Sequence, residues 1–317
     1  HYSSRRQRQM CIRDSYNITD QTSTTADISA KALTATASAS NKVYDGSSAA
    51  TVTLSLSGFI GSETVTSTNS STFNNKNVGT GKTVTVDSIT LADGNNGGLA
   101  SNYSITPGQT TTANITAKSL TISGIIASSK TYNGSTSATL DTSAILYSGF
   151  IPGDTFDGSY TGVFSNANVG TAKTVTITSS YTGADVSNYS ITNQSSTTAD
   201  ISAKALTATA SASNKTYNAT NSASVTLTLS GLIGSETLGS TNTSTFNNKN
   251  VGSNKTVTVN SITLANGSNG GLAANYSISA GQTTTANITA KSLTVSGITA
   301  SNKTYDGSTN VTLTGTA

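Results

Sequence analysis

The chain has 317 residues, of which only 10% are charged, and it contains no tryptophan. Its formal charge of +3 comes from the first 15 residues, because residues 16–317 hold 13 Lys against 13 Asp plus Glu. A neutral body argues against a nucleic-acid partner, and no apolar run approaches the ~18–20 residues of a transmembrane helix.

Residues 1–15, which read HYSSRRQRQMCIRDS, share nothing with the sequence that follows. They contain every arginine of the chain and its only histidine, methionine and cysteine (His1, Met10 and Cys11). They lack the long apolar core and small-residue cleavage site of a signal peptide. The string RRQRQMCIRDS resembles translated sequencing-adapter read-through at the end of a metagenomic gene fragment; a short native basic arm is the alternative. In either case we expect no redox or metal role for Cys11.

The rest of the chain is a tandem repeat. The motif Lys-Ala/Ser-Leu-Thr begins at Lys31, Lys118, Lys204 and Lys291. Residues 31–117 resemble 204–290 more than either resembles 118–203, so two repeat types alternate, named here type A and type B. The predicted segments are a leader (1–15), the tail of a preceding repeat (16–30), type A (31–117), type B (118–203), type A (204–290) and the start of a truncated type B repeat (291–317).

Within residues 31–117, short runs of alternating apolar and Thr/Ser residues predict half-buried strands. The runs are 33–38, 52–56, the flanks of Val65, 84–91, 103–105 and 113–115. Turn-forming residues separate them, notably Asp45-Gly46, Asn74-Asn75 and residues 93–98. Six or seven strands in under 90 residues favour an all-β fold, and we predict tandem Ig-like β-sandwich domains in an elongated array. We expect the partial segments 16–30 and 291–317 to be less ordered.

Three linked motifs in each repeat resemble the bacterial YDG domain and related bacterial Ig-like repeats. In the first repeat these are Asn41-Lys42-Val43-Tyr44-Asp45-Gly46, the segment 73–84 and Asn102-Tyr103-Ser104-Ile105. The resemblance implies a large secreted or surface-attached bacterial exoprotein, often a filamentous-haemagglutinin-like adhesin. The sequence departs from the motif at Asn133-Gly134 and at Asn218-Ala219, and such variation between copies indicates a turn rather than a catalytic position.

The candidate site residues are therefore assigned to a structural repeat motif. We predict tyrosines that are half-buried, that fix a turn and whose hydroxyls bond to the backbone; ligand-stacking aromatics are the alternative. Those of the second set stand where an Ig-like domain carries a tyrosine corner. The motif residues are Tyr44, Asp45, Gly46, Tyr132, Tyr217 and Tyr305, with Tyr103, Tyr189 and Tyr276 in the second set.

Three other sites have both a functional and a structural interpretation. The loop 93–98 suggests calcium, but it has one carboxylate and its counterpart 266–271 has none, so we predict a polar turn. Asp154 and Asp157 form the closest carboxylate pair and are predicted to be solvated. A lysine–asparagine isopeptide bond would need a lysine such as Lys42 or Lys82 packed with an asparagine and an acid, with Glu63 and Glu236 as the acids in the type A repeats.

After the leader, the chain has no His, Cys or Arg, and Ser and Thr have no base to activate them. We therefore predict no enzyme, no cofactor and no metal site. The joins at 115–120 and 201–206 contain no Gly/Pro-rich linker, which predicts restricted bending. The predicted function is a structural stalk of a secreted cell-surface adhesin that projects a distal binding region. The alternative is that the repeats themselves bind a host or neighbouring-cell glycan or protein.

Overall fold

The computed structural model describes residues 22–315. The predictions for the leader 1–15 and for residues 16–21 lie outside these residues. The described chain is almost entirely β-structure, so the prediction of an all-β fold is confirmed. Its regular elements other than strands are three short 3-10 turns.

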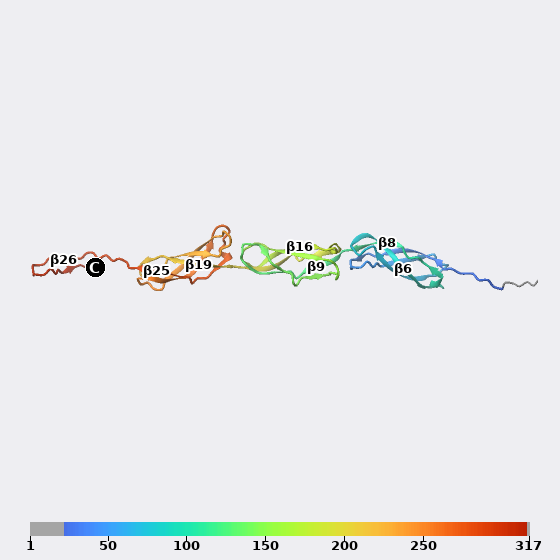
Figure 1. The fold of residues 1–317 in the computed structure, drawn as a ribbon, viewed down its shortest axis with the longest axis horizontal. Coiled ribbons are helices and arrows are strands. Elements are labelled where there is room, and N and C mark those ends of the chain that lie inside the picture. The colour runs from blue at the N-terminus through green and yellow to red at the C-terminus, as the bar shows by residue number, and fades with distance from the viewer. Residues whose placement is uncertain (1–21, 316–317) are drawn as a thin grey trace, which may run out of the picture. The chain divides into compact units, whose positions relative to one another are not determined.

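The strands of the first repeat form three small groups. A four-stranded sheet has the order β3-β8-β6-β5, and the pairs β2-β4 and β1-β7 complete the repeat. Strands β6 and β8 are labelled in Figure 1. The bounds are β1 Lys31–Ala32, β2 Thr34–Ala39, β3 Lys42–Val43, β4 Val52–Ser57, β5 Val65–Phe73, β6 Gly79–Asp93, η1 Ala100–Asn102, β7 Tyr103–Ser104 and β8 Thr110–Thr116.

The second repeat has a five-stranded sheet, β11-β18-β16-β15-β12, with the groups β14-β9-β17 and β10-β13. Its elements are β9 Lys118–Ser123, β10 Ile126–Ala127, β11 Lys130–Thr131, β12 Ser137–Ala138, β13 Leu140–Asp141, β14 Leu146–Ser148, β15 Asp157–Phe164, β16 Gly170–Thr182, η2 Val186–Asn188, β17 Tyr189–Thr192 and β18 Ser196–Ser202.

The third repeat has the sheets β20-β25-β23-β22 and β21-β19-β24. Its elements are β19 Lys204–Ala212, β20 Lys215–Thr216, β21 Val225–Ser230, β22 Leu238–Phe246, β23 Gly252–Asn266, η3 Ala273–Asn275, β24 Tyr276–Ile278 and β25 Thr283–Thr289. The short hairpin of β26 Thr299–Ala300 and β27 Leu313–Thr314 follows, and no residue between 291 and 315 is buried.

A β-bulge distinguishes the long hairpins of the two repeat types. The register of β5 on β6 shifts between Ser70 and Ser71, and that of β22 on β23 shifts between Thr243 and Ser244. The corresponding hairpin of the second repeat, β15 on β16, pairs in one continuous register. A bulge adds local twist and redirects side chains, so the two types differ in backbone geometry as well as in sequence.

The compact units of the structure do not coincide with the repeats. The first unit takes residues up to Leu120 together with Gly149–Phe156 and Gly183–Ile191. The second unit takes Thr121–Ser148, Asp157–Thr182 and the residues from Thr192 onward. Two loops of the second repeat therefore belong to the same compact unit as the first repeat and make contacts with it.

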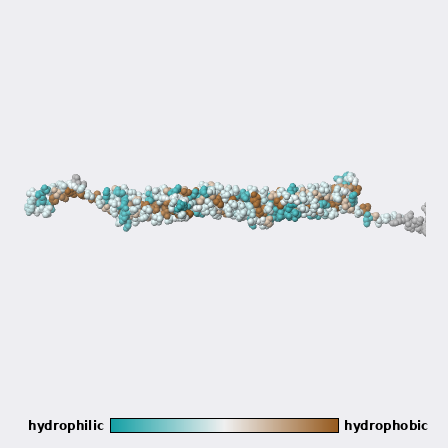
Figure 2. All heavy atoms as spheres, turned by 90° about the horizontal axis from the view of Figure 1, so that it is seen from above, coloured by the Kyte–Doolittle hydropathy of each residue, from teal (hydrophilic) through white to brown (hydrophobic). Residues whose placement is uncertain are grey.

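The surface is chemically plain. On the face shown in Figure 2, most residues have near-neutral hydropathy, and apolar and hydrophilic residues form small separate groups. Thr and Ser on outward strand positions explain this, because they favour strands without creating an apolar face. No helix among residues 22–315 is long and apolar enough to cross a membrane.

Candidate functional site

The Asn-Lys-x-Tyr-Asp/Asn motif forms a turn that its lysine fastens. In the first repeat, Lys42 Nζ donates to Asp45 Oδ1 at 2.8 Å and to the carbonyls of Ser47 and Ala49 at 2.7 and 2.9 Å. Asp45 also accepts the Ser47 N–H, and Gly46 has a φ of 78°, which favours glycine. Burial alone would raise the pKa of Asp45, but the hydrogen bonds from Lys42 and Ser47 outweigh it and lower that pKa.

The same turn tolerates Asn in place of Asp. Lys130 donates to Asn133 Oδ1 at 3.1 Å, and Lys215 donates to Asn218 Oδ1 at 3.0 Å. Each lysine also donates to the two backbone carbonyls that correspond to those of Ser47 and Ala49. The turn needs one acceptor oxygen at this position, and an amide supplies it as a carboxylate does.

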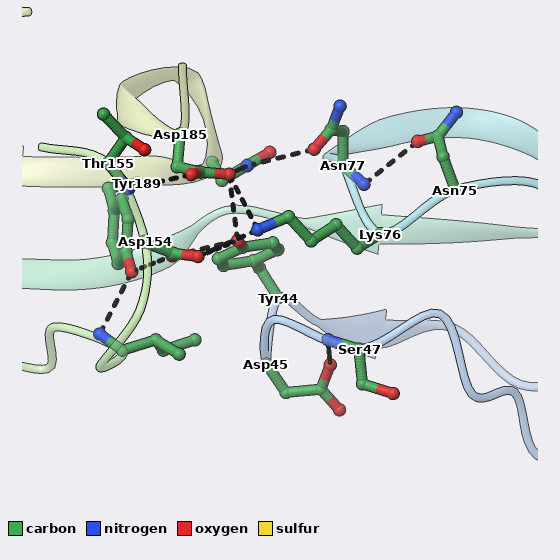
Figure 3. A network of polar contacts seen from close by, with 12 residues as sticks. Tyr44, Asp45, Ser47, Asn75, Lys76, Asn77, Asp154, Thr155, Asp185 and Tyr189 are labelled. Atoms are coloured by element: carbon green, nitrogen blue, oxygen red, sulfur yellow. Dashed lines mark hydrogen bonds and ion pairs between the residues drawn. The ribbon is translucent and has the colours of Figure 1, made fainter. Parts of the chain in front are cut away.

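The tyrosine of this turn points out of its own repeat. Tyr44 is 1% exposed, and its hydroxyl donates to the carboxylate of Asp154 at 2.9 Å (Figure 3). Its ring meets the Tyr189 ring edge-on, with centroids 5.6 Å apart. All three residues belong to the first unit. The prediction of a half-buried tyrosine bonded to the backbone is therefore wrong for Tyr44, which is fully buried against the next repeat.

Asp154 is the centre of this network. Its side chain is 3% exposed, and it accepts hydrogen bonds from Tyr44, from Tyr189 at 2.5 Å and from Lys76 Nζ at 2.9 Å. A second carboxylate, Asp185, also lies 2.9 Å from Lys76 Nζ and accepts the Thr155 N–H. The prediction that Asp154 is a solvated turn residue paired with Asp157 is wrong, because Asp154 is buried and shares Lys76 with Asp185.

The hydrogen bonds set the charge states of this network. Burial would raise the pKa of Asp154, but the donors Tyr189, Lys76 and Tyr44 lower it. The Thr155 backbone N–H and then Lys76 lower the pKa of Asp185. The two aspartates raise the pKa of Lys76. One cation therefore lies against two buried carboxylates, and tyrosine hydroxyls, the Thr155 N–H and Asn188 Nδ2 donate the remaining hydrogen bonds.

Amide side chains close the same contact. Asn188 is fully buried and accepts the Val78 N–H at 2.9 Å, while its Nδ2 donates to Asn77 Oδ1. Close packing also explains Gly46, because a Cβ there would lie 3.1 Å from Ile151 Cγ2. We call the contributing surface of the first repeat its turn end (Tyr44, Gly46, Lys76–Val78) and that of the second repeat its loop end (Ile151, Asp154, Asp185, Asn188, Tyr189). Together they form joint 1.

A second joint of the same kind lies within the second unit. Tyr132 donates to Glu236 Oε1 at 2.6 Å, and Tyr276 donates to Glu236 Oε2 at 2.7 Å. The two rings are 5.4 Å apart and edge-on. Asn275 accepts the Val169 N–H at 2.9 Å, as Asn188 does in joint 1. We call this contact joint 2.

Apolar packing is continuous across joint 2. A single buried cluster includes Tyr132, Phe164 and Val175 of the second repeat together with Leu206 and Tyr276 of the third. Burial of this kind contributes about 1.5–3 kcal/mol per large side chain. The turn end and the loop end therefore join as parts of one core rather than as two surfaces in light contact.

The remaining motif tyrosines lie at ends without this contact. Tyr103 is buried within its own loop end, where it donates to Glu63 at 2.6 Å and accepts the Ile60 N–H. Tyr217 is half-buried, and Tyr305 is 93% exposed. Neither Tyr217 nor Tyr305 has a carboxylate partner among residues 22–315. The three tyrosines of the second set each accept a backbone N–H, and each donates to a carboxylate as well.

The residues that sequence reasoning missed are Lys76, Asp185, Asn188, Glu236 as a tyrosine partner, and Asn275. One signal was available: an acidic residue follows Ile60, Ile151 and Ile233 at the same spacing of three. A second was the asparagine that precedes each Tyr-Ser-Ile. Neither signal reveals the partner, which lies about a hundred positions away in the sequence.

The other sequence candidates take structural positions. Asp93 of the loop 93–98 accepts the N–H of Ala100, the first residue of the short turn η1, at 2.7 Å. Lys82 donates to Asn75 at the surface, whereas Glu63, the proposed acid of an isopeptide bond, is bonded to Tyr103. Lys42 is committed to its turn.

Each complete repeat matches a known protein family. A model of the YDG domain matches residues 29–113, 116–199 and 202–286, one match for each complete repeat. The comparison with curated proteins gave no match.

The turn lysine can be tested against its acceptor. Lys42→Met leaves the carbonyls of Ser47 and Ala49 without their charged donor, and we expect it to destabilise the first repeat by about 1.5–3 kcal/mol. Asp45→Asn reproduces the turn of the second repeat and should change the free energy of unfolding by less than about 0.5 kcal/mol. Thermal unfolding of the full chain compares the two, and equal losses would refute this account of the turn.

Joint 2 should also respond to alkali. Burial, and then the hydrogen bond to Glu236, raise the pKa of Tyr132 to about 12, against ~10 in an unfolded chain. A raised pKa stabilises the folded state fully below about pH 10, and that stabilisation is lost as the pH rises through about 12. Spectrophotometric titration should show late-forming tyrosinate that disappears in denaturant and decreases in Tyr132→Phe. An unchanged titration in Tyr132→Phe would contradict the assignment.

Proposed function

The chain belongs to the YDG-domain family, and on that premise we propose that its repeats are the structural stalk of a secreted bacterial surface adhesin. In this proposal each repeat is an Ig-like sandwich, and the repeats form an elongated array that projects a distal binding region. The stalk performs no catalysis. Its task is to keep successive domains in a fixed relation.

The observation that carries the proposal is the joint. In both joints a buried tyrosine crosses from one repeat to a carboxylate of the next, and an asparagine bonds a backbone N–H across the same boundary. A flexible linker needs neither contact. Directional hydrogen bonds combined with apolar burial resist bending, because a bend breaks the hydrogen bonds to the carboxylate and exposes apolar side chains to water.

The connections between repeats support the same proposal. One residue, Ala117, separates the end of β8 at Thr116 from the start of β9 at Lys118. Ala203 alone separates β18 from β19 in the same way. A connection of one residue leaves little freedom for reorientation, so the chain passes directly from one set of sheets to the next. The plain Thr/Ser surface suits a spacer better than a recognition surface.

The stalk role can be tested by small-angle scattering on the full chain. We expect a maximum dimension close to three repeats end to end, and a broader distance distribution in Asp154→Ala, which removes the shared acceptor of joint 1. Asp157→Ala, which changes an exposed residue of β15, should leave the distribution unchanged. A compact or freely jointed particle for the unmodified chain would exclude the proposal.

A second candidate function, binding of a glycan or protein by the repeats, has one feature in its favour. In the second repeat Tyr160 contacts Tyr147 through the hydroxyls and lies edge-on to Tyr181 at 6.2 Å. Tyr160 also lines an open cavity of about 520 Å³ with Leu140, Gly158 and Gly162. An aromatic ring that lines an open cavity suits a sugar face.

This alternative predicts carbohydrate binding confined to the second repeat. Immobilised full chain should retain a member of a glycan panel, and Tyr160→Ala should abolish that retention. Tyr305→Ala, which removes an exposed tyrosine elsewhere, is the matched control. Equal retention by both variants, or none by the unmodified chain, would exclude the cavity as a binding site.

A further inference from the structure

The two joints share one geometry but differ at two positions. The turn end of joint 1 carries Lys76 where joint 2 carries Ala167. The residue that precedes the 3-10 turn of the loop end is Asp185 in joint 1 and Leu272 in joint 2. In joint 1 these positions form an ion pair at 2.9 Å. In joint 2 both are apolar.

The same two positions characterise every repeat end. The type A repeats have a lysine at the turn end (Lys76 and Lys249) and a leucine at the loop end (Leu99 and Leu272). The type B repeat has Ala167 at its turn end and Asp185 at its loop end. Each type therefore presents a turn end that matches the loop end of the other type and not its own.

Mismatched orders would lose the ion pair of joint 1, and one of them would leave two carboxylates without a cation. Type B after type B would place an alanine against the two aspartates, whose side chains in joint 1 are only 3% and 11% exposed. Two buried carboxylates without a cation are strongly unfavourable. Type A after type A would place the lysine beside a leucine, so its ion pair with the second carboxylate of joint 1 would be lost. Alternation satisfies both positions at every joint.

The outer ends of the first and third repeats have the features of uncovered joints. At the turn end of the third repeat Val251 is 54% exposed, whereas Val78 and Val169 are half-buried. At the loop end of the first repeat Ile60 is 54% exposed and Asn102 is exposed, whereas Asn188 and Asn275 are buried. These residues differ from their covered equivalents in burial, not in type.

We propose that the repeat ends are type-selective docking surfaces. The turn end with Tyr217 and Lys249 accepts a type B repeat, whose loop end presents two aspartates. The loop end with Glu63 and Leu99 accepts the turn end of a type B repeat, which has no cation. This selectivity rests on the proposed stalk function, because both depend on the joints between repeats. It also specifies the order in which the repeats assemble.

Amide hydrogen exchange in the full chain provides a local measurement. The Val78 N–H bonds to Asn188 across joint 1, so its exchange rate reports opening of that joint, and Val169 reports joint 2. We expect Lys76→Ala and Asp185→Leu each to accelerate Val78 exchange by about three- to tenfold. The double variant has the composition of joint 2, and its exchange should be slower than the product of the two single effects predicts. Val169 is the internal control.

Additive effects of the two substitutions on Val78 exchange would overturn the proposal. The reciprocal pair in joint 2, Ala167→Lys and Leu272→Asp, provides an independent cycle read at Val169 if a joint 1 variant fails to fold. Small-angle scattering of the unmodified chain tests the stalk proposal separately. A rigid particle combined with additive effects on Val78 exchange would support the stalk function and exclude type-selective docking. A freely jointed particle combined with coupled effects would exclude the stalk function and support type-selective docking.

The outer surface can be tested by extension of the full chain. Residues 291–317 begin like the second repeat, and continuation with a copy of residues 145–203 completes a type B repeat. We expect Val251 N–H exchange to slow by at least about tenfold, because an asparagine now covers it. Replacement of residues 291–317 together with the continuation by a copy of residues 31–117 places a type A repeat there instead and should protect Val251 less. Equal protection by the two extensions would refute type-selective docking.

Discussion

The structure of both joints depends on one interaction, the hydrogen bond from a buried tyrosine hydroxyl to a carboxylate of the next repeat. A carboxylate removed from water is stable only with several donors. Asp154 receives two tyrosines and a lysine, and Glu236 receives two tyrosines. One tyrosine of each pair comes from each repeat. The carboxylate is therefore satisfied only when the two repeats are joined, and this dependence makes the contact cooperative.

The turn motif follows from the same requirement. The tyrosine must leave its strand at a fixed angle, and the preceding lysine fixes that angle by holding two carbonyls of the turn. Gly46 then allows Ile151 to approach closely. Asp45 has only a local role, because its oxygen accepts hydrogen bonds from the lysine and from a backbone N–H within the turn. Asn133 shows that an amide is sufficient there.

Sequence reasoning recovered the fold better than the site. Alternation of apolar residues with Thr and Ser locates Val84 and Val86 on β6 and Ile115 on β8, and all three are buried. The site was harder, because burial of a polar residue depends on a partner that periodicity does not reveal. Tyr44 was selected as a structural residue, but its partner Asp154 is 110 positions away. Asp154 itself lies beside Pro152 and Gly153, where local sequence indicates a solvated turn.

The internal repeats supply a comparison that a single domain lacks. Asp45 and Asn133 are interchangeable in the turn, because each supplies an acceptor oxygen to the corresponding lysine. Lys76 and Ala167 vary together with Asp185 and Leu272, because a cation and an anion in contact must be kept or lost as a pair. Independent variation therefore identifies a position with a local role, and paired variation identifies contact across a boundary. By that criterion the alternation of the two repeat types follows from the chemistry of the joints between them.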